Sequence, residues 1–226
     1  MTGVGLRRVI ICAALLLSAV LVCVYFARGG GRWRQAQATI EAAEVTPYLK
    51  DGDVICRLGD KLWSSFVKNM SPDDRRFSHL GIVRVRNGSV SVINAECLLR
   101  EREERVNEVS LPEFLKVAKA VGVYRANFIN GTVISEGAAR YLGRPFDWKF
   151  DSSDDAEIYC TELLHAAIKN AAPEYGLESK SVRGFGVTVI PLEAVSKSKD
   201  FDEVAYIDKT GSQLALSGEA ESVNNP

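Results

Sequence analysis

Two alternating segments joined by Asn87-Gly88 constrain the fold of this chain more than any other local feature. They are HLGIVRVR (residues 79–86) and SVSVINAE (residues 89–96), and apolar residues recur in both with a period near two. Asn-Gly between two such segments is the strongest short-range signal for a β-hairpin with a two-residue turn. The sequence therefore predicts two antiparallel strands with Asn87 and Gly88 as the turn residues.

The predicted register gathers polar residues around one histidine. Counting outward from the turn, His79 lies directly opposite Glu96 and one diagonal step from Asn94. Side chains in either relation share a face and lie within contact distance in an antiparallel pair. The same face carries Gly81, Val83, Val85, Val90 and Val92. His79 is therefore expected to contact one of the two polar residues, and the geometry of the hairpin alone slightly favours Glu96.

The balance of charge excludes one broad class of function. The chain has 226 residues, with 28 Lys and Arg against 29 Asp and Glu and a formal net charge of −1. Nucleic-acid binding needs a concentrated basic surface, so no nucleic-acid partner is expected. The length is sufficient to bury a sizeable core in one mixed domain. A single chain is the default expectation for the oligomeric state.

An apolar run near the N-terminus predicts a membrane segment. Residues 9–26 are apolar except for Ser18, and Arg7 and Arg8 precede them. As a helix the run would be roughly 27 Å long, close to the hydrocarbon thickness of a bilayer. A cleaved signal has a shorter apolar region of about 7–15 residues, so residues 1–28 are predicted to be a retained signal-anchor, with a cleaved signal as the alternative. The rest of the chain is expected on the extracytoplasmic (periplasmic) side, anchored by this single transmembrane helix.

Beyond the anchor, the sequence divides into a linker, one folded domain and a tail. Residues 29–50, which begin GGGRWR, are predicted to be a juxtamembrane linker that includes a short helix. Residues 51–209 hold the predicted domain, and residues 210–226 lack a periodic apolar face and are predicted to be disordered. Besides the hairpin, strands are predicted at 53–58, 120–126 and within 184–195 and 202–207, and helices at 59–70, from Ser110, at 130–143 and at 160–172.

Cys160 opens the predicted helix 160–172, directly after an irregular loop. A thiol at the N-terminal end of a helix feels the positive end of the dipole, which is expected to lower its pKa. Reactive thiolate chemistry also needs a base, and the chain contains two histidines, His79 and His165. His165 lies on the same helix roughly 140° around the axis, so it points away from Cys160. His79 is therefore the expected partner of Cys160.

Each of these residues also has an ordinary structural explanation. A cysteine at a helix start is more often a small buried apolar residue, and a strand histidine is more often a hydrogen-bonded structural residue. Cys56 and Cys97 are expected to be structural or to form a disulfide, whereas Cys12 and Cys23 belong to the membrane segment. No CxxC or Cys/His spacing typical of zinc ligands occurs, so neither a metal nor another cofactor is expected.

Six segments that occur in order make the chain similar to one known family. They are DGDVICRL, FSHLGIV, VINAE, AARYLGRPFDWKF, YCTELL and VTVIPLEAV, and the match covers residues 51–207. They resemble the YaeF/YiiX group of permuted papain-like hydrolases, which are relatives of the NlpC-type cell-wall peptidases. This resemblance implies an α+β domain in which an antiparallel sheet packs against helices. It also implies that the strand with the histidine precedes the helix with the nucleophile.

The resemblance assigns roles to particular residues. It implies Cys160 as the nucleophile and His79 as the base. The third polar residue of the family, often a glutamate in this group, falls at Asn94, with Glu96 as the alternative. Asparagine serves this orienting role in ordinary papain-like enzymes, so Asn94 is favoured. Tyr159 is expected to be an oxyanion donor or a hydrogen-bonding residue behind the nucleophile.

Three functions are compatible with these assignments. The leading hypothesis is a thiol-dependent hydrolase that cleaves amide bonds through an acyl-thioester, with cell-wall peptides as one expected substrate. Because permuted papain-like relatives include proteins of the lecithin–retinol acyltransferase type, a lipid-directed acyltransferase or esterase is the first alternative. A non-catalytic ligand-binding domain, suggested by Asn94 in place of glutamate, is the second. The expected partners are thus a peptide, amide or lipid substrate and the membrane, and Asp147 and Trp148 are expected to line the approach to the site or to be structural.

Overall fold

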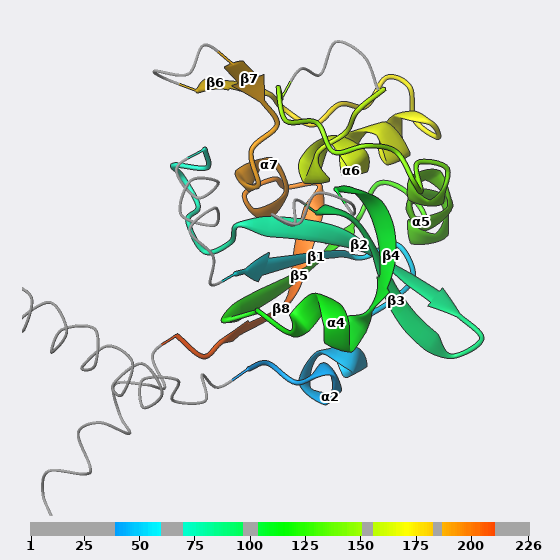
Figure 1. The fold of residues 1–226 in the computed structure, drawn as a ribbon, viewed down its shortest axis with the longest axis vertical. Coiled ribbons are helices and arrows are strands. Elements are labelled where there is room, and N and C mark those ends of the chain that lie inside the picture. The colour runs from blue at the N-terminus through cyan, green and yellow to red at the C-terminus, as the bar shows by residue number, and fades with distance from the viewer. Residues whose placement is uncertain (1–38, 60–69, 97–103, 151–155, 183–186, 211–226) are drawn as a thin grey trace, which may run out of the picture. The chain divides into compact units, whose positions relative to one another are not determined.

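The computed structural model describes residues 39–59, 70–96, 104–150, 156–182 and 187–210 (Figure 1). Within these ranges no helix is long and apolar enough to cross a membrane. The apolar run at residues 9–26 and Cys97 lie outside the described residues, as do nearly all of the helix predicted at 59–70 and of the tail predicted at 210–226. The membrane anchor, this helix and the disordered tail therefore stay predictions.

Six antiparallel strands form the main sheet, in the order β4-β3-β2-β1-β5-β8. The strands are β1 (Val54–Leu58), β2 (His79–Arg86), β3 (Ser89–Glu96), β4 (Arg105–Ser110), β5 (Ala120–Ala126) and β8 (Phe201–Asp208). A small second sheet pairs β6 (Lys180–Val182) with β7 (Val187–Val189). The predicted fold class, a mixed α and β domain built on an antiparallel sheet, is confirmed.

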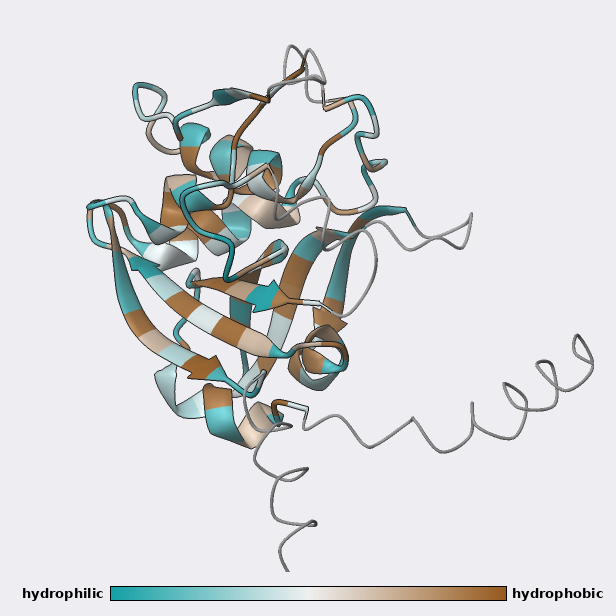
Figure 2. Ribbon diagram, turned by 90° about the vertical axis from the view of Figure 1, so that its left-hand side faces the viewer, coloured by the Kyte–Doolittle hydropathy of each residue, from teal (hydrophilic) through white to brown (hydrophobic). Residues whose placement is uncertain are grey.

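The hairpin of β2 and β3 forms as the sequence predicts. Asn87 has φ 52° and Gly88 has φ 78°. A type I′ turn needs positive φ at both of its central residues, and Asn followed by Gly meets that need at the least steric cost. The strands pair in the predicted register, with Val85 opposite Val90. The apolar and polar residues that alternate along the strands are visible in Figure 2.

Helices cover both faces of the sheet. In Figure 1, α5 (Gly131–Ala139) and α6 (Cys160–Lys169) lie above it, and α4 (Leu111–Leu115) and α2 (Ala42–Val45) lie below. The remaining short helices are η1 (Thr46–Tyr48) and α7 (Glu193–Ser196). Because side chains alternate along a strand, Leu80 and Ile82 pack with residues of α5 and α6, whereas Val83 packs with residues of α4. Both faces of β2 are therefore buried, and the strand is held in a fixed position.

Helix α6 begins at Cys160, as predicted, because the preceding residue caps it. The backbone N–H of Tyr159 donates to the Glu162 carboxylate at 3.3 Å, half of a capping-box arrangement. Leu163, Leu164, Ala167 and Ile168 are fully buried and form the predicted apolar side of the helix. Cap and apolar side together fix the position of Cys160 at the first helical residue.

The close contact between α5 and α6 gives a prediction about stability. A Cβ atom at Gly137 would lie 2.6 Å from the carbonyl oxygen of Ala167. Gly137→Ala should therefore push the two helices apart and lower the free energy of unfolding by about 1–3 kcal/mol, although alanine is the better helix former. Urea unfolding measures the change, with Val133→Ala on the exposed side of α5 as the control. An unchanged or increased stability of the Gly137 variant would contradict the packing described.

Two features of the fold differ from the sequence expectations. Strand β4 was not predicted, since its short edge segment, RVNEVS, has only two apolar residues and lacks the alternation typical of a strand. The packed domain also begins before residue 51: Ile40 and Val45 are buried at 2% and 0% exposure in the cluster around α4. The second half of the predicted linker, which includes α2, is therefore part of the domain.

Candidate active site

His79 is the first residue of β2, and Asn94 of β3 binds its ring. Nε2 of His79 lies 3.0 Å from Oδ1 of Asn94, whose side chain is buried. Because Oδ1 is an acceptor, Nε2 carries the proton in this contact, and Nδ1 is the basic nitrogen of the ring. Gly81 makes room for the contact, since a Cβ there would lie 3.1 Å from Cβ of Asn94 and 2.4 Å from a methyl group of Val92.

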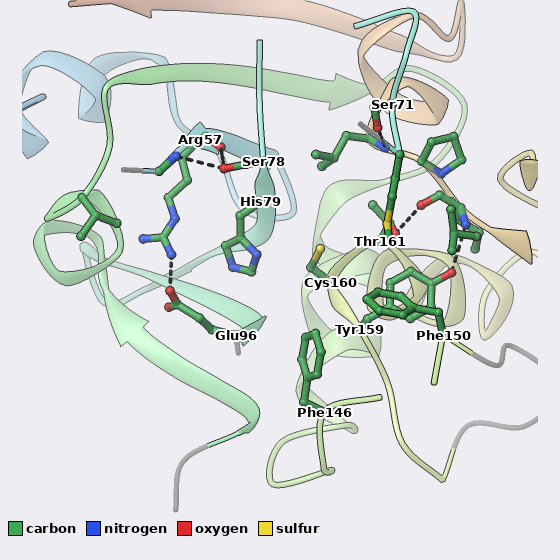
Figure 3. A pocket seen from close by; sticks show the side chains of 17 residues that line it. Arg57, Ser71, Ser78, His79, Glu96, Phe146, Phe150, Tyr159, Cys160 and Thr161 are labelled. Atoms are coloured by element: carbon green, nitrogen blue, oxygen red, sulfur yellow. Dashed lines mark hydrogen bonds and ion pairs between the residues drawn. The ribbon is translucent and has the colours of Figure 1, made fainter. Parts of the chain in front are cut away.

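Glu96, the other polar residue predicted beside His79, is bound to an arginine. Its carboxylate forms an ion pair with the guanidinium of Arg57 on β1, whose side chain is only 5% exposed. Both residues line the same pocket as His79 (Figure 3). The two candidates for the third position thus have different partners, with Asn94 on the imidazole and Glu96 on Arg57.

Cys160 projects into this pocket from the start of α6, across from His79 (Figure 3). Burial raises the pKa of its thiol to about 11, and the backbone N–H groups of Leu80, Thr161 and Cys160 itself, with the charge of Arg57, offset that rise only in part. The sequence predicted a lowered pKa from the helix dipole. That prediction is wrong in direction, because burial destabilises the thiolate more than the backbone N–H groups and Arg57 stabilise it. The resting thiol is therefore protonated at neutral pH.

The raised pKa predicts how fast Cys160 reacts with iodoacetamide as a function of pH. The thiolate is the reactive form, so the alkylation rate should rise about tenfold per pH unit from pH 7 to pH 10. Peptide mass spectrometry measures the rate, with Cys56, which is fully buried and also has a raised pKa, as the unreactive control. A rate for Cys160 that is already at its plateau below pH 8 would instead indicate a preformed thiolate–imidazolium pair.

The residues on either side of Cys160 hold one wall of the pocket. The hydroxyl oxygen of Tyr159 accepts the backbone N–H of Ile190 at 3.0 Å, and the hydroxyl of Thr161 donates to the carbonyl of Ile190 at 2.6 Å. Burial raises the pKa of the Tyr159 hydroxyl, so this group stays protonated. Tyr159 thus lies behind the nucleophile, where it ties the segment after β7 to the start of α6.

The pocket is in large part apolar. Its lining includes Met70, Val117, Phe146, Phe150, Val189, Pro191 and Leu192. The Phe150 ring lies 5.2 Å from the Tyr159 ring, and its backbone has φ 54°, a strained conformation for a bulky residue. Asp147 and Trp148 were expected either to line the approach or to be structural, and neither is a lining residue of the pocket. Asp147 is buried and accepts the N–H of Lys149 at 2.7 Å, which fits the structural role. The neighbouring phenylalanines line the pocket in their place.

The residues that sequence reasoning missed are Arg57, Phe146 and Phe150. The motif RPFDWKF contains the two phenylalanines, so an aromatic wall was a readable signal, although its orientation was not. Arg57 stands in the buried strand VICRL, and a charged residue at such a position is itself a signal of a specific partner. In the described part of the chain, no group of three or more His, Cys, Asp or Glu side chains is placed to hold a metal ion.

Comparisons with known proteins agree with this fold. Residues 48–212 match the family described as "Permuted papain-like amidase enzyme, YaeF/YiiX, C92 family". The chain is 24% identical over 155 residues to the uncharacterized protein YiiX of Escherichia coli K12, which covers 66% of this chain and 71% of that protein.

A solved structure supports the fold. The crystal structure of yiiX from Escherichia coli O157:H7, whose title calls it a metalloprotein, matches with a TM-score of 0.58 and 19% sequence identity. The match covers 70% of this chain and 98% of that one, and at this identity it shows the fold alone. Since the family match takes in most of the sequence, the chain belongs to the permuted papain-like amidase family of the YaeF/YiiX type.

Proposed function

We propose that this protein is a thiol-dependent amidase in which Cys160 is the nucleophile, His79 the base and Asn94 the residue that orients the base. The observation that carries the proposal is the shared pocket. Cys160 enters it from the start of α6 and His79 enters it from β2, with the imidazole held by Asn94. A nucleophile, a base and a group that orients the base are the parts that acyl transfer needs.

The first half of the reaction forms an acyl-thioester. Nδ1 of His79 takes the proton of the Cys160 thiol as the sulfur attacks the carbonyl carbon of the amide. The backbone N–H of Cys160, at the first position of α6, supports the negative oxygen of the tetrahedral intermediate. His79 then gives its proton to the nitrogen of the leaving amine, the C–N bond breaks, and the acyl group remains on sulfur.

The second half releases the acid. A water molecule loses a proton to Nδ1 of His79 and attacks the thioester carbonyl, and the C–S bond breaks. The proton returns to the sulfur, so the enzyme regains its starting state. Throughout, the Asn94 contact holds Nε2 as the protonated nitrogen and leaves Nδ1 to work as base and acid.

The apolar wall favours a second candidate on the same machinery. Phe146, Phe150 and Leu192 surround the space beside Cys160, which suits an apolar acyl group better than a charged one. A lipid-directed esterase or acyltransferase would use the same Cys160 and His79 with an alcohol as leaving group or acceptor.

Peptides, including cell-wall peptides, remain the substrates expected of the amidase. Together with the apolar run at residues 9–26, the proposal places the activity at the extracytoplasmic face of a membrane.

A substrate panel separates these candidates. The full chain in detergent micelles is incubated with acyl-amino-acid anilides, short peptides, aliphatic acyl esters and phospholipid, and the products are identified by mass spectrometry. Release of amine from amides supports the amidase, and release of fatty acid from esters or phospholipid alone supports the second candidate. If no member of either set is cleaved faster than by the Cys160→Ala variant, the hydrolase proposal fails.

A further inference from the structure

Arg57 is a buried charge next to His79 that the proposed chemistry does not use. In the pairing of β1 with β2, Arg57 is the direct partner of His79. Arg57 is 4% exposed. Its guanidinium donates to the backbone carbonyl of Phe114 and to the Glu96 carboxylate. Isolated charges are rarely buried at this level, because their desolvation is costly unless a partner compensates it. The ion pair with Glu96 therefore compensates the cost of burying the Arg57 charge beside His79.

Arg57 and His79 share one aromatic platform, the ring of Phe114. The Arg57 guanidinium carbon lies 4.5 Å from the centre of the Phe114 ring, and the His79 ring lies 5.8 Å from it, tilted by 32°. Phe114 belongs to α4 and is fully buried. The platform fixes the positions of guanidinium and imidazole relative to each other, so a change of charge on one is felt by the other.

Glu96 is placed to compete with Asn94 for contact with the imidazole of His79. The register of β2 with β3, continued from Ile82 opposite Ile93, brings Glu96 across from His79, and both line the pocket. A carboxylate next to an imidazole stabilises the imidazolium and removes the neutral base. In the structure the carboxylate binds Arg57 instead, and the neutral amide of Asn94 holds the ring.

We propose that Arg57 is a positioning residue that neutralises Glu96 and so keeps His79 an uncharged base held by Asn94. The role of Arg57 in catalysis rests on the proposed function, whereas its effect on the charge of His79 can be measured without any activity. It explains why two polar residues on one face of β3 have different partners. It also suits a site whose thiol is protonated at rest, since a protonated thiol needs a neutral base.

Among the residues that the structure describes, few charged side chains line the pocket around His79. Facing His79 are Arg57 from β1, Glu96 from β3, and Cys160 and Tyr159 from the start of α6. Burial raises the pKa of both Cys160 and Tyr159, so neither is charged at neutral pH. Helix α4 contributes the uncharged Phe114, and Arg105 of β4 pairs with Glu96 through the backbone ladder. In the part of the chain that the structure describes, the charged side chains that line the pocket with the imidazole are therefore those of Arg57 and Glu96.

Titration of the His79 ring by NMR tests the proposal without any substrate. The chain has two histidines, so ring-labelled full-length protein in micelles gives two titration curves, and His165→Gln assigns them. Arg57→Gln removes the guanidinium charge from beside Glu96 and should raise the His79 midpoint by about one pH unit. Glu96→Gln leaves the Arg57 charge unpaired and should lower it. The double variant should return the midpoint to within a few tenths of the wild-type value.

The controls separate charge from structure. Arg57→Lys keeps the charge and should leave the midpoint near its wild-type value. Arg84→Gln removes the arginine of another ion pair of the sheet, with Glu108 of β4 at 2.9 Å, and should also have no effect. Glu96→Gln preserves the shape of the side chain, so its downward shift tests the proposal even if Arg57→Gln does not fold. Unchanged midpoints in the single variants, or shifts that do not cancel in the double variant, would overturn it, whatever the outcome of the activity assays.

Discussion

Cys160→Ala is expected to lower kcat for amide hydrolysis by at least about 1,000-fold, because the acyl-thioester can no longer form. The thiol lies at the first residue of α6, in the pocket that also holds His79. Removal of one sulfur from this half-buried position should leave the fold intact, so far-UV circular dichroism and thermal unfolding should match the wild type. Steady-state kinetics on the best amide of the substrate panel measures the loss.

The control for this variant is the other described free cysteine. Cys56 lies on β1 opposite Leu80 of β2 and is fully buried in the core. Cys56→Ala should retain the activity and lose a little stability, because it removes a small buried group and leaves the pocket unchanged. Activity that survives Cys160→Ala, or that disappears equally in the Cys56 variant, would contradict the assignment of Cys160 as the nucleophile.

His79→Ala is expected to have an effect of similar size, about 1,000-fold or more on kcat. The reason is the pKa of the Cys160 thiol, which burial raises to about 11. With so little thiolate at neutral pH, attack depends on a base that removes the proton in the same step. In this variant the rate should therefore rise steeply with pH, and added imidazole should restore part of it.

Asn94→Ala tests the orienting contact separately. It removes the acceptor 3.0 Å from Nε2 and should reduce kcat by about 100-fold through loss of alignment, while imidazole should not rescue it. His165→Gln serves as the control for both variants, since Nδ1 of His165 accepts the N–H of Leu177 and His165 is not a lining residue of the pocket. An Asn94→Ala variant with wild-type kcat would exclude the proposed role of this amide.

Local sequence signals predicted the parts of the site that a single hairpin or helix determines. Asn87-Gly88 fixes the turn and hence the register, and the register alone brings Asn94 within a diagonal step of His79. The start of α6 at Cys160 follows from its apolar side and from the Glu162 cap. The hairpin alone did not determine whether Asn94 or Glu96 contacts His79, because this choice depends on Arg57 of a third strand, β1.

What the sequence did not predict arises from contacts between distant segments. Arg57 reaches Glu96 only because β1 pairs with β2 in the sheet. The thiol pKa depends on how completely the surrounding elements exclude water from Cys160, and helix position alone suggested the opposite direction. The aromatic wall depends on the backbone of Phe150, whose positive φ is a rare conformation that no propensity favours.

The most direct test of the central claim is to trap the acyl group on the enzyme. The full chain is mixed with an activated acyl ester or anilide, quenched in acid within its first turnover, digested and examined by mass spectrometry. We expect the mass of the acyl group on the peptide that contains Cys160, removable by hydroxylamine, absent in Cys160→Ala and much slower to form in His79→Ala. Product release with no acyl group on Cys160 at any time, or acylation that proceeds equally well without His79, would contradict the account.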